Sequence, residues 1–397
     1  MKTDIKKKIS KSLGRFEVWL DQNGFESYDQ FDFWGSKIGV QGKKIFLKDK
    51  FLGAPIVFPL QILESFFPRT RRIFAKTKRF AIGDAHFVLG FMNLYNVQYD
   101  EKYLEIAKNI LDEILSSATE TTSGIGWGYP YVWVTEGAVY PEGTPFITVT
   151  PYCFYALIRM YELTGETKYF TAAEEAARYA AYDLNETQIS DCESAASYSP
   201  IDADGVINAN AYRAAMLLMA DNLFSIPQYK EKAALNINFV INNQNDDGSW
   251  FYSPDSLFID NFHTCFVLKN LFKSYLICRD ATILHSVKKG YEYYRNCLFR
   301  ADNTPIHFAK IRYPKFRKIE MYDYAEGISL GVLLKDDIEG ALEFAWLLAA
   351  DLVNKFQLED GYFITRVSTL GTKNKIPYLR WPQAQIFYAL TNLLSIQ

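Results

Sequence analysis

The residues best suited to acid–base chemistry stand at the beginnings of apolar segments. His263 follows Asp260 by three positions, a spacing that puts both side chains on one face of a helix. An aspartate so placed can orient a histidine for proton transfer. The same spacing fits a second interpretation, in which Asp260 is an N-cap and His263 a packed helix residue.

A second candidate for acid–base chemistry is Glu326, which follows Tyr324. A carboxyl group buried among tyrosines has a raised pKa and can act as a general acid, whereas a glutamate in the first turn of a helix can simply face the helix dipole. Glycoside hydrolysis needs a second carboxyl group, for which Asp202, Asp204 and Glu142 are the candidates. The proposed catalytic set is Glu326, His263, Asp260 and Asp202.

Aromatic and basic residues could bind a sugar in the same place. The chain holds 30 Phe, 27 Tyr and 7 Trp, and a tyrosine or tryptophan offers an apolar face to a sugar ring and a polar tip. An arginine can bind a carboxylate or phosphate through two hydrogen bonds. The alternatives are aromatic residues that pack a loop on the scaffold and arginines in internal ion pairs. The expected substrate-binding residues are Asp84, His86, Trp127, Tyr129, Tyr131, Trp133, Asn210, Arg213, Tyr324, Arg380, Trp381 and Gln383.

Several function classes are disfavoured by missing motifs. The five cysteines show no C-x-x-C spacing and no H-x-x-x-H element occurs, so we expect no metal site and no cofactor. Elements of the G-x-x-x-x-G-K-[ST] and G-x-G-x-x-G types are also absent, which disfavours nucleotide hydrolysis and a Rossmann cofactor. A G-x-S-x-G match occurs at 327–331, but it lies inside the predicted inner segment 324–334 and does not follow a strand, so it gives no support to an α/β-hydrolase.

Charge and hydropathy set further limits. The net charge is −3 without a basic stripe, so we expect no nucleic-acid partner. Two short basic stretches, 69–78 and 310–318, could face an anionic substrate or form solvated surfaces. The first residues lack the apolar core of a secretory signal, and no stretch approaches the roughly 20 apolar residues of a membrane span. We therefore expect a cytoplasmic protein.

Helical periodicity dominates the chain and comes in two kinds. Segments 102–116, 171–184, 229–242 and 338–356 each have one charged face. Between them lie segments that are apolar nearly all round and recur at intervals of roughly 60 residues, as expected for a helical repeat. These inner segments are 84–96, 150–163, 208–224, 260–277, 324–334 and 381–396.

Six pairs of an outer and an inner helix can close into a ring, which leaves no exposed end face. We therefore predict an all-α fold, an (α/α)6 toroid that spans 1–397 as a single domain. Residues 1–50 form an N-terminal helical extension or supply the first outer helix, for which 9–22 and 55–66 are the candidates.

Long loops precede the inner helices and should gather at one end of the ring. They span 118–148, 188–207, 243–259, 299–322 and 357–379 and have room for short β-hairpins. The beginnings of the inner helices meet at that end, and helix N-termini attract anions. The pattern predicts one aromatic-lined pocket at the mouth of the ring.

Two motifs resemble those of known toroids. The stretch N-Q-N-D-D-G-S-W at 243–250 resembles the Q-x-x-x-G-x-W turn of (α/α)6 terpenoid cyclases and toroidal sugar enzymes, which implies a structural turn. The stretch R-W-P-Q-A-Q-I-F-Y-A-L at 380–390 is similar to the last inner helix of the N-acylglucosamine 2-epimerase family. Gln385 stands where that family has Glu, and the paired histidines of that family are not found in their usual contexts.

Four further stretches lie in the order found in the VpsJ-like group of toroidal proteins from bacterial exopolysaccharide clusters. They are G-W-G-Y-P-Y-V-W at 126–133, P-E-G-T-P-F-I-T-V-T at 141–150, D-A-D-G-V-I-N-A-N at 202–210 and D-N-F-H-T at 260–264. The resemblance spans residues 80–395. It implies a role in polysaccharide biosynthesis, with an oligosaccharide, polysaccharide or sugar precursor as ligand and partners from a polysaccharide synthesis operon.

Three hypotheses about function follow. The first is a carbohydrate-active enzyme, a glycosidase, lyase or epimerase that works through acid–base side chains in the pocket. The second is a non-catalytic sugar-binding or scaffold subunit, which a pocket without paired carboxyl groups would favour. The third is an isoprenoid or terpenoid-cyclase-like enzyme, which a dry aromatic cavity without charged residues would favour.

Overall fold

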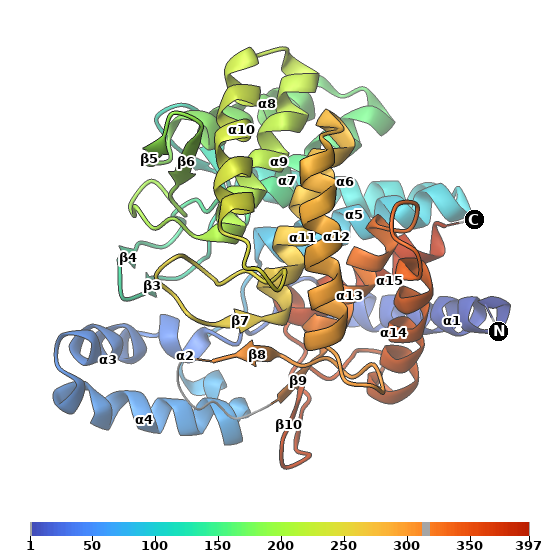
Figure 1. Ribbon diagram of the computed structural model, residues 1–397. Helices are drawn as coiled ribbons and strands as arrows, with labels where there is room; N and C mark the ends of the chain where they lie inside the picture. Colours follow the sequence, from blue (N-terminus) through green and yellow to red (C-terminus); the bar gives the residue numbers. More distant parts are fainter. Residues whose placement is uncertain (1, 312–317, 397) are drawn as a thin grey trace.

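Six inner helices form the centre of a closed ring. The computed structural model describes residues 2–311 and 318–396. Within that part of the chain, each inner helix packs on the next and the last returns to the first, so the ring closes (Figure 1). This confirms the predicted (α/α)6 toroid. The inner helices are α5 (Ala81–Gln98), α7 (Thr150–Thr164), α9 (Ile207–Phe224), α11 (Asn261–Cys278), α13 (Met321–Leu333) and α15 (Ala384–Leu394), the last preceded by the π-helical turn η2 (Leu379–Gln383).

Six outer helices cover this centre in the described part of the chain. Of the two candidates for the first outer helix, segment 9–22 lies in α1, which packs against α14 and α15. Segment 55–66 lies in another helix, α4, which pairs with α3 outside the ring. The outer helices are α1 (Lys2–Asn23), α6 (Glu101–Ser116), α8 (Thr167–Tyr182), α10 (Pro227–Asn242), α12 (Ala281–Cys297) and α14 (Ala341–Phe356).

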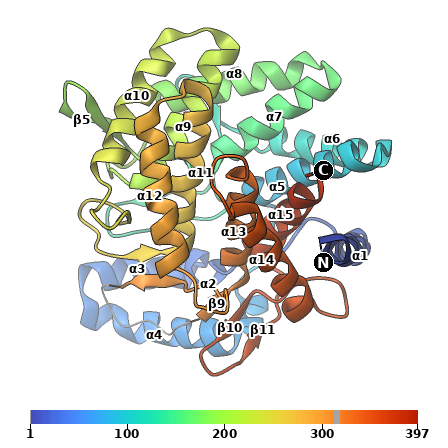
Figure 2. The same cartoon turned by 45° about the vertical axis from the view of Figure 1, so that its right-hand side comes forward.

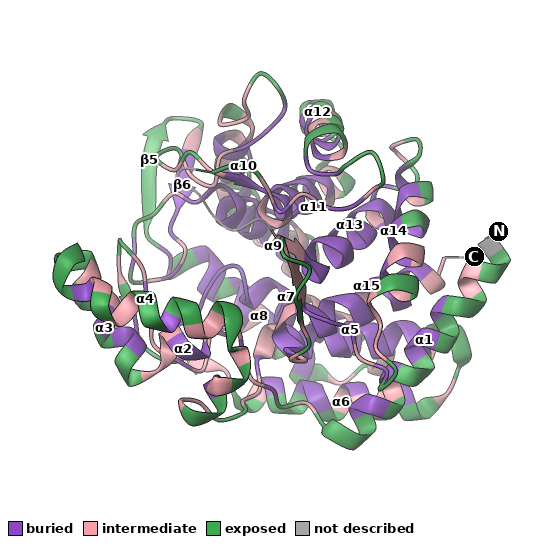
Figure 3. Ribbon diagram, turned by 90° about the horizontal axis from the view of Figure 1, so that it is seen from below, coloured by how far each residue is buried: buried purple, intermediate pink, exposed green. Residues whose placement is uncertain are grey.

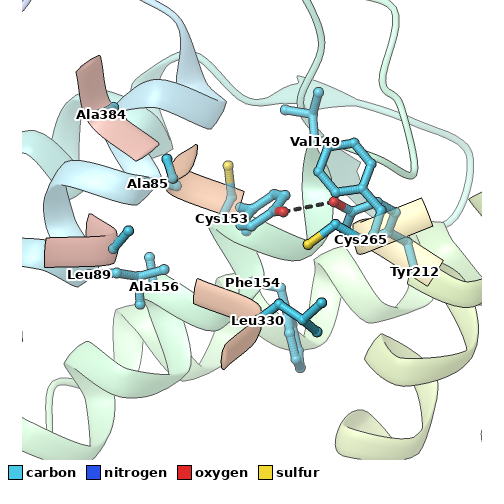
Figure 4. Packing of buried hydrophobic residues seen from close by; sticks show 14 of the residues in the cluster. Ala85, Leu89, Val149, Cys153, Phe154, Ala156, Tyr212, Cys265, Leu330 and Ala384 are labelled. Carbon is cyan, nitrogen blue, oxygen red and sulfur yellow. Dashed lines mark hydrogen bonds between the residues drawn. The ribbon is translucent and has the colours of Figure 1, made fainter. Parts of the chain in front are cut away.

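The difference between inner and outer helices follows from their side chains. Small residues let the inner helices approach closely: Ala85, Ala156 and Ala384 are fully buried where α5, α7 and α15 meet (Figure 4). The outer helix α6 instead buries one stripe, which includes Tyr103 and Ala107, and exposes the rest (Figure 3). Both patterns agree with the periodicity from which the helices were predicted.

The loops of the two ends differ in length as expected. Short turns lead from inner to outer helices, and Gly165 ends α7 with a left-handed φ of 71°. The long loops carry the short antiparallel hairpins that the sequence allowed for. The strands pair as β1 (Thr119–Glu120) with β2 (Ile125–Gly126), β3 (Trp133–Val134) with β4 (Val139–Tyr140), β5 (Glu186–Ser190) with β6 (Glu193–Ala196), β7 (Ile259–Asp260) with β8 (Phe308–Lys310), and β10 (Arg366–Ser368) with both β9 (Lys318–Glu320) and β11 (Lys373–Asn374).

The motif at 243–250 forms the expected structural turn. The Gln244 side chain donates to the carbonyl oxygen of Gly248 at 2.9 Å, and the Trp250 indole donates to that of Val240 at 2.8 Å. Gly248 has a φ of +92°, and a Cβ there would lie 2.5 Å from the carbonyl oxygen of Lys289. Only glycine fits at that position.

The chain between α1 and α5 leaves the ring and covers its mouth. It holds α2 (Asp32–Gly35), α3 (Lys37–Lys48), α4 (Lys50–Phe66) and a 3-10 turn, η1 (Pro68–Ile73). Figure 2 shows α3 and α4 at the same end of the ring as β9, β10 and β11. The first basic stretch of the sequence, 69–78, belongs to this excursion. In the second basic stretch, 310–318, residues 312–317 lie outside the described residues. Across the described ranges, no helix has the length and apolar character needed to span a membrane.

Candidate functional site

A cavity of about 520 Å³ opens at the mouth of the ring. Its wall is built from the starts of inner helices, from the long loops and from the N-terminal excursion, so residues far apart in the chain meet there. The residues used below are Glu64, Tyr129, Tyr131, Trp133, His263, His307, Lys318, Glu320, Tyr322, Arg366, Arg380, Trp381 and Gln385.

The first acid–base group of the cavity is His263. Asp260 caps α11 by accepting a hydrogen bond from the backbone N–H of His263 at 2.9 Å, and its other oxygen lies 2.7 Å from Nδ1 of the same residue. The aspartate is 2% exposed, whereas the histidine side chain is 22% exposed and lines the cavity. The structure thus combines both sequence interpretations, because Asp260 is an N-cap and also orients His263.

A second histidine–aspartate pair faces the same cavity. Nδ1 of His307 lies 2.8 Å from Oδ2 of Asp323, which is fully buried in the first turn of α13. Burial raises the pKa of Asp323, and His307 opposes that rise. The backbone N–H of Asn261 donates to the carbonyl oxygen of His307 at 3.0 Å, beside the short ladder of β7 and β8.

One phenyl ring separates the two pairs. The ring centroid of Phe262 lies 4.1 Å from that of His263 and 5.6 Å from that of His307. Both imidazoles therefore lie near one aromatic side chain of the cavity wall.

The aromatic wall has two parts. Tyr129 and Tyr131 stack at 5.5 Å with their planes 5° apart, and Trp133 meets Tyr129 edge-on at 5.8 Å. On the other side, Trp381 stacks on Tyr322 at 3.6 Å, also with planes 5° apart. Such paired planar faces suit the apolar face of a sugar ring.

Charged groups complete the lining. Arg380 binds Asp29 through two hydrogen bonds, at 2.6 and 2.8 Å. Arg366 contacts Glu64 at 3.1 Å and Glu320 at 3.7 Å. Burial opposes ionisation of Glu320, but Lys318 and Arg366 outweigh it, so the pKa of Glu320 lies below its usual value.

Glu326 does not line this cavity. It is buried in α13, where its carboxylate forms an ion pair with Lys269 of α11. The carboxylate therefore faces a neighbouring helix and not the hollow, and its burial is compensated by a cation. The expected partner Asp202 is also elsewhere: it accepts hydrogen bonds from the backbone of Tyr198 and Ser199 and holds a turn.

Asp84 and His86 are buried away from the cavity lining. Asp84 accepts a hydrogen bond from Arg79 at 3.0 Å, and burial raises its pKa to about 7. His86 packs on Tyr152 with ring centroids 4.3 Å apart, and burial lowers its pKa to about 3. Neither residue is among the cavity lining.

Five other expected binding residues hold the scaffold together. Arg213 donates to the carbonyl oxygens of Ala180 and Ala181 and pairs with Glu186, behind the ring wall. The other four also bond or pack away from the cavity, on loops, on outer helices or on neighbouring backbone. They are Asn210 on the backbone of β6, Trp127 on the carbonyl oxygen of Ile114, Gln383 on the backbone of Phe363, and Tyr324 against Phe356.

The structure brings seven of the expected residues together. Six of them line the cavity and the seventh, Asp260, holds His263: the six are Tyr129, Tyr131, Trp133, His263, Arg380 and Trp381. Sequence reasoning missed the His307–Asp323 pair, which has no local spacing to reveal it. It also missed Glu320, Arg366 and the residues of the N-terminal excursion. Within 2–311 and 318–396, no group of three or more His, Cys, Asp and Glu side chains is placed to hold a metal ion.

Comparisons with known proteins identify the fold. A scan of protein-family models finds no match, and a search of curated proteins finds no similar sequence. Among solved structures, cellobiose 2-epimerase from Bacillus thermoamylovorans B4167 matches with a TM-score of 0.62 and 13% identity, covering 80% of this chain and 87% of that one.

Two further solved structures are similar. D-mannose isomerase matches with a TM-score of 0.59 and 12% identity over 80% of this chain and 88% of that one. An unsaturated glucuronyl hydrolase specific for heparin matches with a TM-score of 0.58 and 12% identity over 78% and 85%. At these identities the likeness concerns architecture alone: the chain has the (α/α)6 toroid fold of these sugar-acting proteins.

Proposed function

We propose that the protein is a sugar epimerase or isomerase that transfers a proton at a carbon next to a carbonyl group. One observation carries the proposal: two histidines, each bound through Nδ1 to a buried aspartate, line one cavity. An ionised carboxylate only accepts, so Nδ1 donates and Nε2 is left to take a proton. His263 and His307 then form two similar bases on one substrate.

The reaction that suits two such bases starts from the open-chain form of a reducing sugar. One histidine takes the proton from C2, and the electrons of that C–H bond form a C1–C2 double bond as the C1 oxygen becomes an anion. The other histidine starts the cycle as an imidazolium, gives its Nε2 proton to the opposite face of C2 and yields the 2-epimer. Each turnover exchanges the protonation states of the two histidines, and proton exchange with solvent restores them. Protonation at C1 instead yields the ketose. Arg366 and Arg380 line the same cavity, but each is already paired with carboxylates of the protein. Only N–H groups not used in those pairs could donate to the anionic intermediate.

The carboxylates of the cavity support this proposal over glycoside hydrolysis. Among the described lining residues, Glu64 and Glu320 both contact Arg366, and the pKa of Glu320 is lowered. A general acid needs a carboxyl group that keeps its proton near neutral pH. These charged residues also speak against an isoprenoid substrate, and two aspartate-oriented histidines exceed what a sugar-binding subunit needs.

The test follows C–H exchange directly. The protein is incubated in D₂O with reducing monosaccharides, disaccharides, N-acylamino sugars and uronic acids, and ¹H NMR follows the C2 proton. We expect one sugar class to lose its C2 signal as an epimer or ketose appears. Cleavage of a glycosidic bond without exchange would contradict the proposal.

Variants of the histidines give the matched control. His263→Asn and His307→Asn each remove one base and are expected to abolish turnover with little change in melting temperature. His285 lies exposed on the outer helix α12, so His285→Asn should keep full turnover. Equal loss in all three variants would show that the cavity histidines have no special role.

A place in exopolysaccharide metabolism is a further part of the proposal, supported by the four VpsJ-like stretches of the sequence. It includes a cytoplasmic location and partners from the same operon. Deletion of the gene should change the sugar composition of the secreted polysaccharide, with the protein recovered in the cytoplasmic fraction. An unchanged polysaccharide would count against this placement.

A further inference from the structure

The helix α4 exposes an apolar stripe that its own fold does not cover. Phe51, Pro55, Phe58 and Ile62 follow one another at intervals of three or four residues and are all exposed, Phe51 to 92%. The opposite side of α4, with Gly53 and Leu60, is buried. A surface helix usually turns its apolar side inward and its charged side outward. Here both sides are apolar, which marks the outer one as an interaction surface.

Neighbouring segments extend this stripe. Leu52 is 69% exposed beside it, and Ile73 at the end of η1 is 79% exposed. On α3, Ile38 and Ile45 are also exposed. Figure 3 shows α3 and α4 side by side at the edge of the molecule, with exposed residues facing outward. These residues of α3, α4 and η1 are called the α4 surface below.

The charge of this segment identifies its partner. Residues 37–76 contain nine Lys and Arg but two acidic residues, a net charge of +7 in a chain whose total is −3. Both acidic residues are engaged within the protein: Asp49 caps α4 and Glu64 pairs with Arg366. Arg71 is buried beside Asp32 and Asp49 is exposed, but the other exposed charges around the stripe are basic, among them Lys44, Lys48 and Arg72.

We propose that the α4 surface docks on a lipid bilayer that carries anionic headgroups. Large apolar side chains set in a ring of lysines and arginines are the features of helices that lie in the plane of a membrane surface. The apolar side chains enter the boundary between headgroups and acyl chains, and the basic residues meet the negative surface potential. A second copy of this chain fits less well, because two such basic surfaces repel each other.

Docking would bring the mouth of the cavity to the lipid surface. Glu64, two positions from Ile62, lines the cavity from the opposite side of the same helix. The cavity and the bilayer would then be separated by about one helix diameter, roughly 10 Å. Sugars attached to a membrane carrier could reach the histidines from there, a consequence that rests on the proposed function. The docking itself does not, since vesicle binding is measured without any sugar.

The experiment is co-sedimentation of the full chain with two kinds of vesicle. One is phosphatidylcholine alone, and in the other about a third of the lipid is phosphatidylglycerol. We expect binding to the anionic vesicles that weakens as salt is raised. The variant F51S/F58S/I62S should lower the binding constant by about tenfold or more. The variant K44Q/K48Q/R72Q should lower it by about a hundredfold, on anionic vesicles alone.

A matched control replaces exposed apolar residues elsewhere. Val97, Tyr99 and Ile189 lie outside the α4 surface, so V97S/Y99S/I189S should bind like the wild type, and circular dichroism should show the same fold for all variants. Wild-type protein that fails to bind either vesicle would overturn the proposal. Equal losses of vesicle binding in the surface and control variants would also overturn it. A stable dimer in sedimentation velocity that F51S/F58S/I62S disrupts, with vesicle binding unchanged, would overturn it too.

Discussion

Replacement of Asp323 by asparagine tests whether the second histidine is oriented for proton transfer. In the wild type, Oδ2 of Asp323 accepts from Nδ1 of His307 at 2.8 Å. An asparagine of the same shape can present its amide N–H₂ to Nδ1, and the imidazole then carries its proton on Nε2. His307 would remain in place but could no longer accept a proton from the substrate.

The size of the effect follows from this loss of one base. A positioned acid–base group contributes about 10²- to 10⁴-fold to the rate, so kcat for Asp323→Asn should fall by that factor, or about 3 to 5 kcal/mol of transition-state stabilisation. The side-chain volume is kept and a hydrogen bond can remain, so the free energy of unfolding should change by no more than about 1 kcal/mol. The assay combines initial rates of epimer formation with urea denaturation.

Asp202→Asn is the matched control for this variant. Asp202 is also buried, but its hydrogen bonds hold the backbone of a turn and touch neither histidine. Its replacement should lower stability and leave kcat of the folded protein unchanged. An Asp323→Asn variant with wild-type kcat, or one that loses rate only in proportion to its unfolded fraction, would refute the reasoning.

Three other variants test the remaining assignments. Glu326→Gln breaks the buried pair with Lys269 and should lower the free energy of unfolding by about 3 kcal/mol or more. In assays at low temperature, where the variant is folded, kcat/KM should be unchanged. A variant that is fully stable but has lost turnover would return Glu326 to the catalytic set. Trp381→Ala removes the face that stacks on Tyr322 and should raise KM by about tenfold through lost stacking, as seen in initial rates, with kcat little changed. Asp84 has a pKa of about 7 in the fold against 3.8 for a free side chain, so the native state binds more protons between these values and the free energy of unfolding falls as pH rises. Urea denaturation at pH 5 and pH 8 should show a smaller fall for Asp84→Asn, and an identical pH dependence would contradict this account of its burial.

The ring could be predicted because each helix carries its role in its own residues. The apolar segment 208–224 and the amphipathic segment 229–242 differ by whether one face is charged, and they become α9 and α10. The excursion of α3 and α4 escaped prediction for the same reason. Segment 55–66 was a candidate for the first outer helix, yet it is apolar all round and lacks the charged face of the other outer segments. In the structure α4 lies outside the ring and exposes Phe58.

The site was only partly visible in the sequence because its geometry is partly non-local. Asp260 and His263 stand one helical turn apart, so their contact could be predicted from spacing. His307 reaches Asp323 across 16 positions that include the strands β8 and β9, and no spacing rule covers such a contact. Glu326 stands at a helix start like Asp323, but its direction depends on how α13 is rotated, which the sequence does not give.

The central claim is that His263 and His307 exchange protons with one carbon of one sugar. The most direct measurement is ¹H NMR in D₂O of the wild type and of each single His→Asn variant with the responsive sugar. The account predicts that the wild-type product gains one deuterium at C2. In each variant, at most one of the two epimers should exchange its C2 proton with solvent, and neither epimer should be converted into the other. Product formed by the wild type with its original C2 proton, or conversion by both single variants, would contradict it.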